Sequence, residues 1–279
     1  MITARTKHLI ALALAEDAAR EDITSRAIFP ARHHSRAVID AKQDLVVCGL
    51  DVAAEVFRRM NRSLRVRRLV RDGDRVKRGA VVMRIEGPTA AILAAERTAL
   101  NFLQRLSGIA TQSARYAAAV AGTGVQVIDT RKTTPGWREL EKYAVRTGGG
   151  GNHRVSLAAM FLIKDNHIAA AGSLTRAVKL CRAAARRGIK VEVEARTLAE
   201  VREAAASGAD IILLDNMSPA RIRAAVAIIN RKAMVEVSGG VTFKTLRKFA
   251  LPGVNFISVG ALTHSVAAAD LSLDLLKSV

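Results

Sequence analysis

The chain has few of the residues that mark several common classes of protein. It contains only two cysteines, Cys48 and Cys181, at no metal-binding spacing, so we expect free thiols in a reducing cytoplasm. Only 4% of its residues are aromatic, which leaves the basic segments without side chains that stack on nucleic-acid bases. The longest run without a charged residue, 249–269, contains proline, asparagine and glycines, which excludes a membrane span there.

Acidic residues are also scarce beside basic ones. The chain has 25 Asp and Glu against 44 Lys and Arg, a formal net charge of +19. An excess of this size favours a nucleic acid or another polyanion as partner. The basic residues are spread over the whole chain, however, which is more typical of a solvated surface, so we do not expect nucleic acid as a partner. Half of the residues are apolar, which argues against a disordered chain.

The N-terminus does not resemble a signal peptide. A short apolar run follows Lys7, but Glu16 and Asp17 come directly after it, where a signal peptide has small neutral residues. We therefore expect a cytoplasmic protein that is not bound to a membrane.

Two kinds of pattern divide the chain. The first part predicts a small sheet domain, with helices over 5–20 and 50–60 and β-prone runs at 37–41, 45–48, 64–69, 80–85 and 89–90. From 91 to 121, apolar residues recur every three or four positions, which predicts helical runs interrupted at Gly108. Strand–helix units follow, with helices expected near 174–187, 198–207, 219–230 and 243–250.

Six apolar segments in the second half of the chain each end in a charged, hydroxyl or glycine residue. These ends are Arg131, Lys164, Glu194, Asp215, Ser238 and Gly260. Their separations of 21 to 33 residues leave room for a strand, a helix and two turns each time. In parallel α/β folds, ligands bind at the carboxyl ends of the strands, so the six ends predict one shared site.

The first two ends carry positive charge. Arg131 can grip a carboxylate or phosphate with its planar fork, and Lys132 adds a compact charge beside it. A glycine run, 148–151, then allows close approach of the backbone to an anion and leads to His153 and Arg154. Lys164 ends an apolar strand, where an ammonium group must face a carboxylate or an anionic ligand.

The remaining ends carry carboxylates and glycines. Glu194 and Asp215 end successive strands and can hold Mg²⁺, neutralise the cations, or act as acid and base. Ser238 with the glycines after it, and Gly260, lie where barrels commonly hold a phosphate. The combination suits a phosphorylated polyanion with Mg²⁺ and a second, carboxylated partner. No nucleophile paired with a base stands out, so covalent catalysis is not the first choice.

Seven segments carry a resemblance to a known family. They are ERTALNFLQRLSGIAT at 96–111, DTRKTTPG at 129–136, GGGGNHR at 148–154, LIKDNHI at 162–168, LLDNMSP at 213–219, SGGV at 238–241 and ISVGALTHS at 257–265. With them the chain resembles the quinolinate phosphoribosyltransferases, also called carboxylating nicotinate-nucleotide pyrophosphorylases, over nearly its whole length.

The resemblance implies a fold and domain boundaries. The fold is an α/β type II phosphoribosyltransferase, with an N-terminal open-faced α+β sheet domain and an incomplete six-stranded parallel α/β barrel. We expect the sheet domain at 1–107, with 267–279 packing on it, and the barrel at 108–266. The implied reaction is Mg²⁺-dependent: quinolinate and PRPP (5-phosphoribosyl 1-diphosphate) give nicotinate mononucleotide, pyrophosphate and carbon dioxide, a step of NAD biosynthesis.

The resemblance also implies the site residues. The two carboxylates of quinolinate would be bound by Arg97, Arg131, His153, Arg154 and Lys164. The PRPP side would be lined by Lys132, Glu194, Asp215, Asn216, Ser238, Gly239, Gly260 and His264. Among these, Lys132, Glu194 and Asp215 would be catalytic, and Glu194 and Asp215 would hold Mg²⁺ directly or through water. Arg97 would reach the active site of the neighbouring subunit, which implies a homodimer.

Three positions depart from the family pattern, and three other functions stay open. Arg196 stands where the family more often has an acid, Ala159 replaces a common Asp, and Glu21 replaces a Gly. Nicotinate phosphoribosyltransferase shares the reaction logic, but its substrate carries one carboxylate, whereas five cationic candidates favour a dicarboxylate. The other two are a paralogue associated with molybdenum transport and a nucleic-acid-binding protein that keeps the barrel.

Overall fold

The computed structural model describes residues 2–276, so residue 1 and residues 277–279 of the predicted C-terminal segment lie outside the described residues. The chain forms two compact units. The first takes in the residues up to 114, residues 134–149 and the end of the chain from 266; the second takes in 115–133 and 150–265. The predicted domain boundaries near 107 and 266 stay a prediction, since the first unit also contains residues 108–114 and 134–149.

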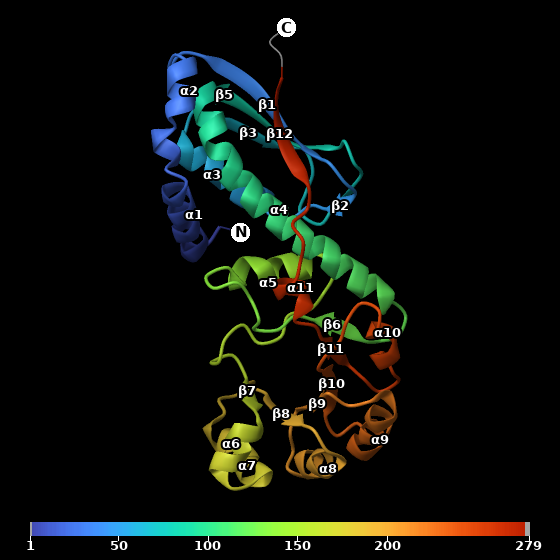
Figure 1. Cartoon of the computed structure of the whole chain (residues 1–279). Coiled ribbons are helices and arrows are strands. Elements are labelled where there is room, and N and C mark those ends of the chain that lie inside the picture. The colour runs from blue at the N-terminus through green and yellow to red at the C-terminus, as the bar shows by residue number, and fades with distance from the viewer. Residues whose placement is uncertain (1, 277–279) are drawn as a thin grey trace. The chain divides into compact units, whose positions relative to one another are not determined.

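The first unit is built on an antiparallel sheet. The strands are β1 (His34–Ala41), β3 (Arg65–Arg68), β5 (Val81–Pro88) and β12 (Leu271–Leu276), in the order β12-β1-β5-β3. Ala37, Ile39 and Ala41 of β1 are buried at every second position, which gives the sheet one apolar face. β12 pairs with β1 although the two are far apart in the sequence (Figure 1).

Short elements complete the first unit. A two-stranded sheet joins β2 (Leu45–Val46) to β4 (Arg75–Val76), and the helices are α1 (Ala4–Glu16), a 3-10 turn (Ala19–Glu21), α2 (Ile23–Ile28), α3 (Leu50–Met60) and α5 (Arg138–Thr147). The prediction of a helix at 50–60 is confirmed, because α3 has those bounds.

The long helix α4 (Thr89–Ala119) differs from the sequence prediction in two ways. The predicted strand at 89–90 is wrong: Thr89 is buried, and its hydroxyl bonds His33 and Ser35 at 2.7 Å each where the helix begins. The predicted interruption at Gly108 is also wrong, since the helix continues through it. A Cβ on Gly108 would lie 2.3 Å from the carbonyl oxygen of Ala267, so this glycine allows close packing rather than a break.

The second unit is a six-stranded parallel sheet with helices, which confirms the predicted fold class. Its strands are β6 (Gln126–Ile128), β7 (Phe161–Ile163), β8 (Val191–Ala195), β9 (Ile211–Asp215), β10 (Met234–Ser238) and β11 (Phe256–Ser258). Their order is β6-β11-β10-β9-β8-β7, so the first strand lies beside the last and the sheet is open between the first and second. A barrel left incomplete at one place has this order.

Helices follow the strands as the spacing predicts. They are α6 (Asp165–Ala171), α7 (Leu174–Ala184), α8 (Leu198–Ala206), α9 (Pro219–Ile229), α10 (Leu246–Phe249) and α11 (Ala261–His264). α8 begins with a capping box of Thr197 and Glu200, and α9 with Ser218 and a proline at its first position.

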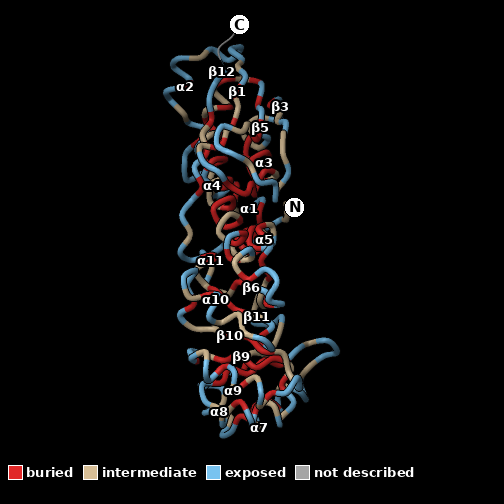
Figure 2. The backbone as a smooth tube through the Cα atoms, turned by 90° about the vertical axis from the view of Figure 1, so that its right-hand side faces the viewer, coloured by how far each residue is buried: buried red, intermediate tan, exposed pale blue. Residues whose placement is uncertain are grey.

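The buried residues of this unit follow the strands (Figure 2). Every residue of β8 is buried, as in a sheet covered on both faces. Among residues 2–276, no helix is long and apolar enough to cross a membrane.

Candidate active site

A pocket of about 890 Å³ lies in the second unit, at the carboxyl ends of the parallel strands. Twelve of the thirteen predicted site residues line it: Arg131, Lys132, His153, Arg154, Lys164, Glu194, Asp215, Asn216, Ser238, Gly239, Gly260 and His264. The parallel topology explains this gathering, because each strand delivers its last residues to the same edge of the sheet. The thirteenth residue, Arg97, belongs to α4 in the first unit, and its role toward a neighbouring subunit stays a prediction.

Lys164 faces a carboxylate, as expected for an ammonium group at the end of an apolar strand. Its Nζ lies 2.5 Å from Oε2 of Glu194, on the adjacent strand. Lys164 is also the N-cap of α6, and its backbone N–H donates to Nδ1 of His167 at 3.0 Å. The backbone of the lysine is therefore fixed, while its side chain extends to Glu194 on the adjacent strand.

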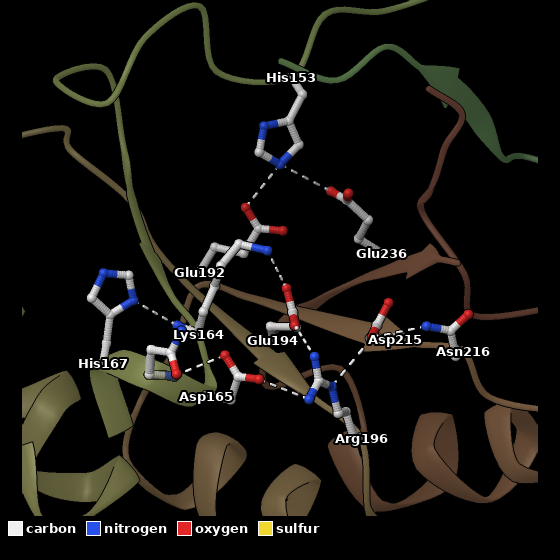
Figure 3. Close-up of polar contacts among 11 residues, drawn as sticks. His153, Lys164, Asp165, His167, Glu192, Glu194, Arg196, Asp215, Asn216 and Glu236 are labelled. Carbon is white, nitrogen blue, oxygen red and sulfur yellow. Dashed lines mark hydrogen bonds and ion pairs between the residues drawn. The ribbon is translucent and has the colours of Figure 1, made fainter. Parts of the chain in front are cut away.

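Arg196 lies among three carboxylates, which we call the carboxylate ring: Asp165, Glu194 and Asp215 (Figure 3). Its Nη1 is 2.8 Å from Asp165, its Nη2 is 3.3 Å from Glu194, and its Nε is 3.3 Å from Asp215. The pKa of Asp165 is lowered, mainly by the backbone N–H of Asn166 and then by Arg196. Each nitrogen of the guanidinium thus serves a different carboxylate.

His153 lies beside two buried glutamates that the sequence analysis did not predict, Glu192 and Glu236; we call these three residues the buried cluster, of which His153 and Glu236 line the pocket. Nε2 of His153 lies 3.0 Å from Glu192 and 3.6 Å from Glu236 (Figure 3). A signal for both glutamates exists in the sequence. Each stands two positions before a predicted site residue, Glu194 or Ser238, and therefore points to the same face of its strand.

The hydrogen bonds fix the tautomer of His153. Its Nδ1 accepts the backbone N–H of Arg154 at 2.8 Å, so the ring proton is on Nε2 and points to Glu192. Burial, and then the charge of Glu192, raise the pKa of Glu236 well above its ordinary value. Burial and the neighbouring Glu192 therefore both favour the protonated form of Glu236.

The loop that carries His153 is held by Asp129 at the end of β6. The buried carboxylate of Asp129 accepts the side-chain amide of Asn152 at 2.7 Å and the backbone N–H of His153 at 2.9 Å. Gly151 packs on the same strand, where a Cβ would lie 2.8 Å from Ile128. No residue of the glycine run 148–151 lines the pocket, and Gly148, like Gly151, lies where a Cβ would collide with neighbouring atoms; the predicted contact of this run with an anion stays a prediction.

Two guanidinium groups crowd the cationic side of the pocket. Arg154 donates to the carbonyl oxygen of Met160 at 3.0 Å, and its buried Nε has no hydrogen-bond partner among the described residues. Burial, and then the charge of Arg131, lower the pKa of Arg154. The repulsion between these two cations favours an anionic ligand between them.

Glycines shape the opposite side. Gly239 has φ +99°, and a Cβ there would lie 2.2 Å from Oδ1 of Asn216, whose backbone N–H donates to Ser238 at 2.9 Å. Gly260 leaves room for Lys132, because a Cβ on it would lie 3.1 Å from Cδ of that lysine. Ser238, Gly239 and Gly260 thus line this side of the pocket with small residues, which phosphate groups can approach closely.

Among the described residues, the buried cluster is the one group of histidine and carboxylate side chains whose ligand atoms lie close enough together to hold a metal ion, and it does not fit one as it is arranged. In the buried cluster, Nε2 of His153 already bears the proton that it donates to Glu192, whereas a metal needs a bare nitrogen. In the carboxylate ring, each carboxylate already gives an oxygen to Arg196. The metal role of Glu194 and Asp215 therefore stays a prediction, and this arrangement does not favour direct coordination.

Comparisons with known proteins identify the same family over most of the chain. Residues 22–107 match the family model described as quinolinate phosphoribosyl transferase, N-terminal domain, and residues 109–274 match the C-terminal domain of the same family. The chain is 43% identical to a probable nicotinate-nucleotide pyrophosphorylase (carboxylating) of Bacillus subtilis, covering 94% of this chain and 91% of that one. It is 42% identical to a chloroplastic enzyme of the same name from Arabidopsis thaliana, covering 96% and 82%.

Solved structures give the same result. The crystal structure of NadC from Streptococcus pyogenes aligns with a TM-score of 0.93 at 41% identity, covering 97% of each chain.

Proposed function

Because the chain belongs to the quinolinate phosphoribosyltransferase family, we propose that it transfers the phosphoribosyl group of PRPP to the ring nitrogen of quinolinate. The products are nicotinate mononucleotide, pyrophosphate and carbon dioxide, and the reaction feeds NAD biosynthesis. The observation that carries this proposal is that Arg131, Lys132, Arg154 and Lys164, all predicted from the sequence, line one pocket.

Quinolinate supplies the anion that the crowded cations need. Its two carboxylates would lie between Arg131 and Arg154, near Lys164, and each guanidinium can hold a carboxylate through two parallel hydrogen bonds. Nicotinate has one carboxylate and would leave one of these cations without a counter-charge in a partly buried pocket. We therefore favour the dicarboxylate as substrate.

The transfer step separates charge, and the pocket has groups for both signs. As pyrophosphate leaves, positive charge develops on the ribose, where Glu194 and Asp215 stabilise it, and negative charge develops on the leaving group near Lys132. Asn216, Ser238 and the glycines beside it would hold the phosphate groups. The ring nitrogen becomes cationic when its bond to the ribose forms.

Loss of carbon dioxide follows from that cationic nitrogen. The bond between the ring carbon and the departing carboxylate breaks, its electron pair stays on the ring carbon, and a proton replaces the carboxylate. The adjacent positive nitrogen and the cationic pocket stabilise the electron pair, so the step needs no further organic cofactor.

We propose a cytoplasmic homodimer in which Arg97 completes the site of the partner, with Mg²⁺ as cofactor. Arg97 lies within the segment 96–111, one of the segments in which the sequence resembles the family. Mg²⁺ commonly binds enzymes through substrate phosphates, and PRPP carries a diphosphate.

Purified protein with PRPP, Mg²⁺ and either quinolinate or nicotinate tests the proposal. We expect nicotinate mononucleotide and carbon dioxide in equal amounts from quinolinate, and little product from nicotinate. Product from nicotinate alone would indicate the nicotinate enzyme. Salt-sensitive binding of oligonucleotides without any turnover would indicate a nucleic-acid-binding protein instead.

A further inference from the structure

The carboxylate ring lies where three neighbouring strands of the sheet end, β7, β8 and β9. Asp165 begins α6, Glu194 lies near the end of β8 and Asp215 ends β9. Three carboxylates that converge in one place repel one another unless a cation lies among them. In proteins that cation is commonly a divalent metal ion, because carboxylate oxygens are the ligands that Mg²⁺ and Mn²⁺ prefer.

In this chain the cation is a side chain. The guanidinium of Arg196 points its three nitrogens at three different carboxylates, at 2.8, 3.3 and 3.3 Å (Figure 3). A lysine could not do this, because its ammonium group is a single point, whereas the arginine fork has five donors in one plane. Lys164 adds a second positive charge at Glu194.

The backbone of Arg196 is fixed where the side chain needs it. Its N–H donates to Oε2 of Glu200 at 2.7 Å, and its carbonyl oxygen accepts Nη2 of Arg221 at 2.8 Å. Glu200 also closes the capping box of α8. The side chain itself is 54% exposed, so it reaches the ring from the solvent side without burying the charge.

We propose that Arg196 is the resident cation of the carboxylate ring and keeps a free divalent ion from binding there. Mg²⁺ then enters the pocket only with the diphosphate of the phosphorylated substrate. The first statement, that Arg196 excludes a free divalent ion, stands on the geometry alone. The second statement, that Mg²⁺ enters with the diphosphate, rests on the proposed function. Arg196 acts as a positioning residue, since it orients Glu194 and Asp215 without itself reacting.

Binding of Mn²⁺ to the protein without substrate tests the first statement. Electron paramagnetic resonance of free Mn²⁺ at low ionic strength reports how much metal each protein binds. We expect weak, unsaturated binding by the wild type. Arg196→Ala should bind one ion per chain about tenfold more tightly or better, because a positive charge leaves the ring. Arg202→Ala, which removes an exposed arginine from α8, matches the change in net charge and should behave as the wild type.

A double variant locates the bound ion. Arg196→Ala combined with Asp215→Asn should lose the gained affinity if the ion lies in the ring. Tight binding of Mn²⁺ by the wild type that Asp215→Asn removes would overturn the proposal. So would an Arg196→Ala protein that keeps its circular dichroism spectrum and melting temperature yet gains no affinity.

The second statement needs turnover as a separate readout. The dependence of the rate on Mg²⁺ at fixed PRPP should follow the formation of the Mg²⁺–PRPP complex in the wild type. In Arg196→Ala the rate should show a second dependence on Mg²⁺, at lower Mg²⁺ concentration. If the variant binds Mn²⁺ but its rate lacks this second dependence, the proposal that Mg²⁺ enters only with the diphosphate would be overturned. A protein inactive on quinolinate still answers the Mn²⁺ titration, so the proposed function and the first statement fail independently.

Discussion

Nε of Arg196 lies 3.3 Å from Oδ2 of Asp215, so the carboxylate that ends β9 is held by the residue that follows β8. The interaction spans two neighbouring parallel strands at the edge where ligands bind. Because Arg196 is exposed to solvent, this pair adds little to the stability of the fold. Its consequence is orientation, because the carboxylate oxygen is directed along the rim of the pocket.

Arg131→Ala is expected to lose most of the activity while the protein stays folded. Truncation removes the bidentate grip on a quinolinate carboxylate, and kcat/KM should fall by about two orders of magnitude or more. Arg131→Lys keeps the charge without the fork and should recover only a small part. Near-normal turnover by Arg131→Ala, measured by pyrophosphate release, would rule out the proposed clamp.

Mixing two inactive variants tests the proposed role of Arg97. If Arg97 serves the partner's pocket, an Arg97→Ala and Arg131→Ala heterodimer contains one intact site and one doubly altered site. A randomly reassorted mixture should then regain about a quarter of the wild-type activity. Should the mixture stay as inactive as its components, although the subunits exchange, the shared site would be wrong.

Gly239→Ala should damage the phosphate side. The new Cβ would lie 2.2 Å from Oδ1 of Asn216, at a backbone with φ +99°. We expect a loss of about 1 to 3 kcal/mol in the free energy of unfolding and a raised KM for PRPP. Gly240→Ala is the matched control, because it also has positive φ but its Cβ would meet open space. Equal effects of the two changes on the KM for PRPP would show that strain alone, not Asn216, is responsible.

Glu236→Gln should change how stability depends on pH. The pKa of Glu236 is raised above 4.5 in the folded protein, so its share of stability is present at low pH. As the pH rises above 4.5, Glu236 ionises in the unfolded chain before it does so in the folded protein. Its contribution to the free energy of unfolding then falls, by about 1.4 kcal/mol per pH unit at most. Glutamine mimics the protonated acid and should remove this loss.

The dependence on pH can be measured by thermal unfolding of both proteins between about pH 5 and about pH 9, the range in which a carboxyl group with a raised pKa titrates. The melting temperature of Glu236→Gln should rise relative to the wild type as pH increases. Parallel curves for the two proteins would show that Glu236 is not held in its protonated form.

The sequence predicted the site residues at the ends of strands better than those inside strands. Lys164 and Asp215 were found because a polar residue closes an apolar run, a pattern that parallel topology makes meaningful. Glu192 and Glu236 were missed, although each shares a strand face with a predicted site residue, because their contact with His153 depends on a loop that lies far away in the sequence. The role of Arg196 was equally out of reach, because it depends on three side chains brought together by the fold.

The pairing of β12 with β1 has a consequence for how the chain is made. The sheet of the first unit needs Leu271–Leu276, which are synthesised after every strand of the second unit, to cover the edge of His34–Ala41. The second unit lies between these segments in the sequence and has all its strands earlier. During synthesis the barrel can therefore close first, while the N-terminal sheet waits with an open edge, a state that favours aggregation.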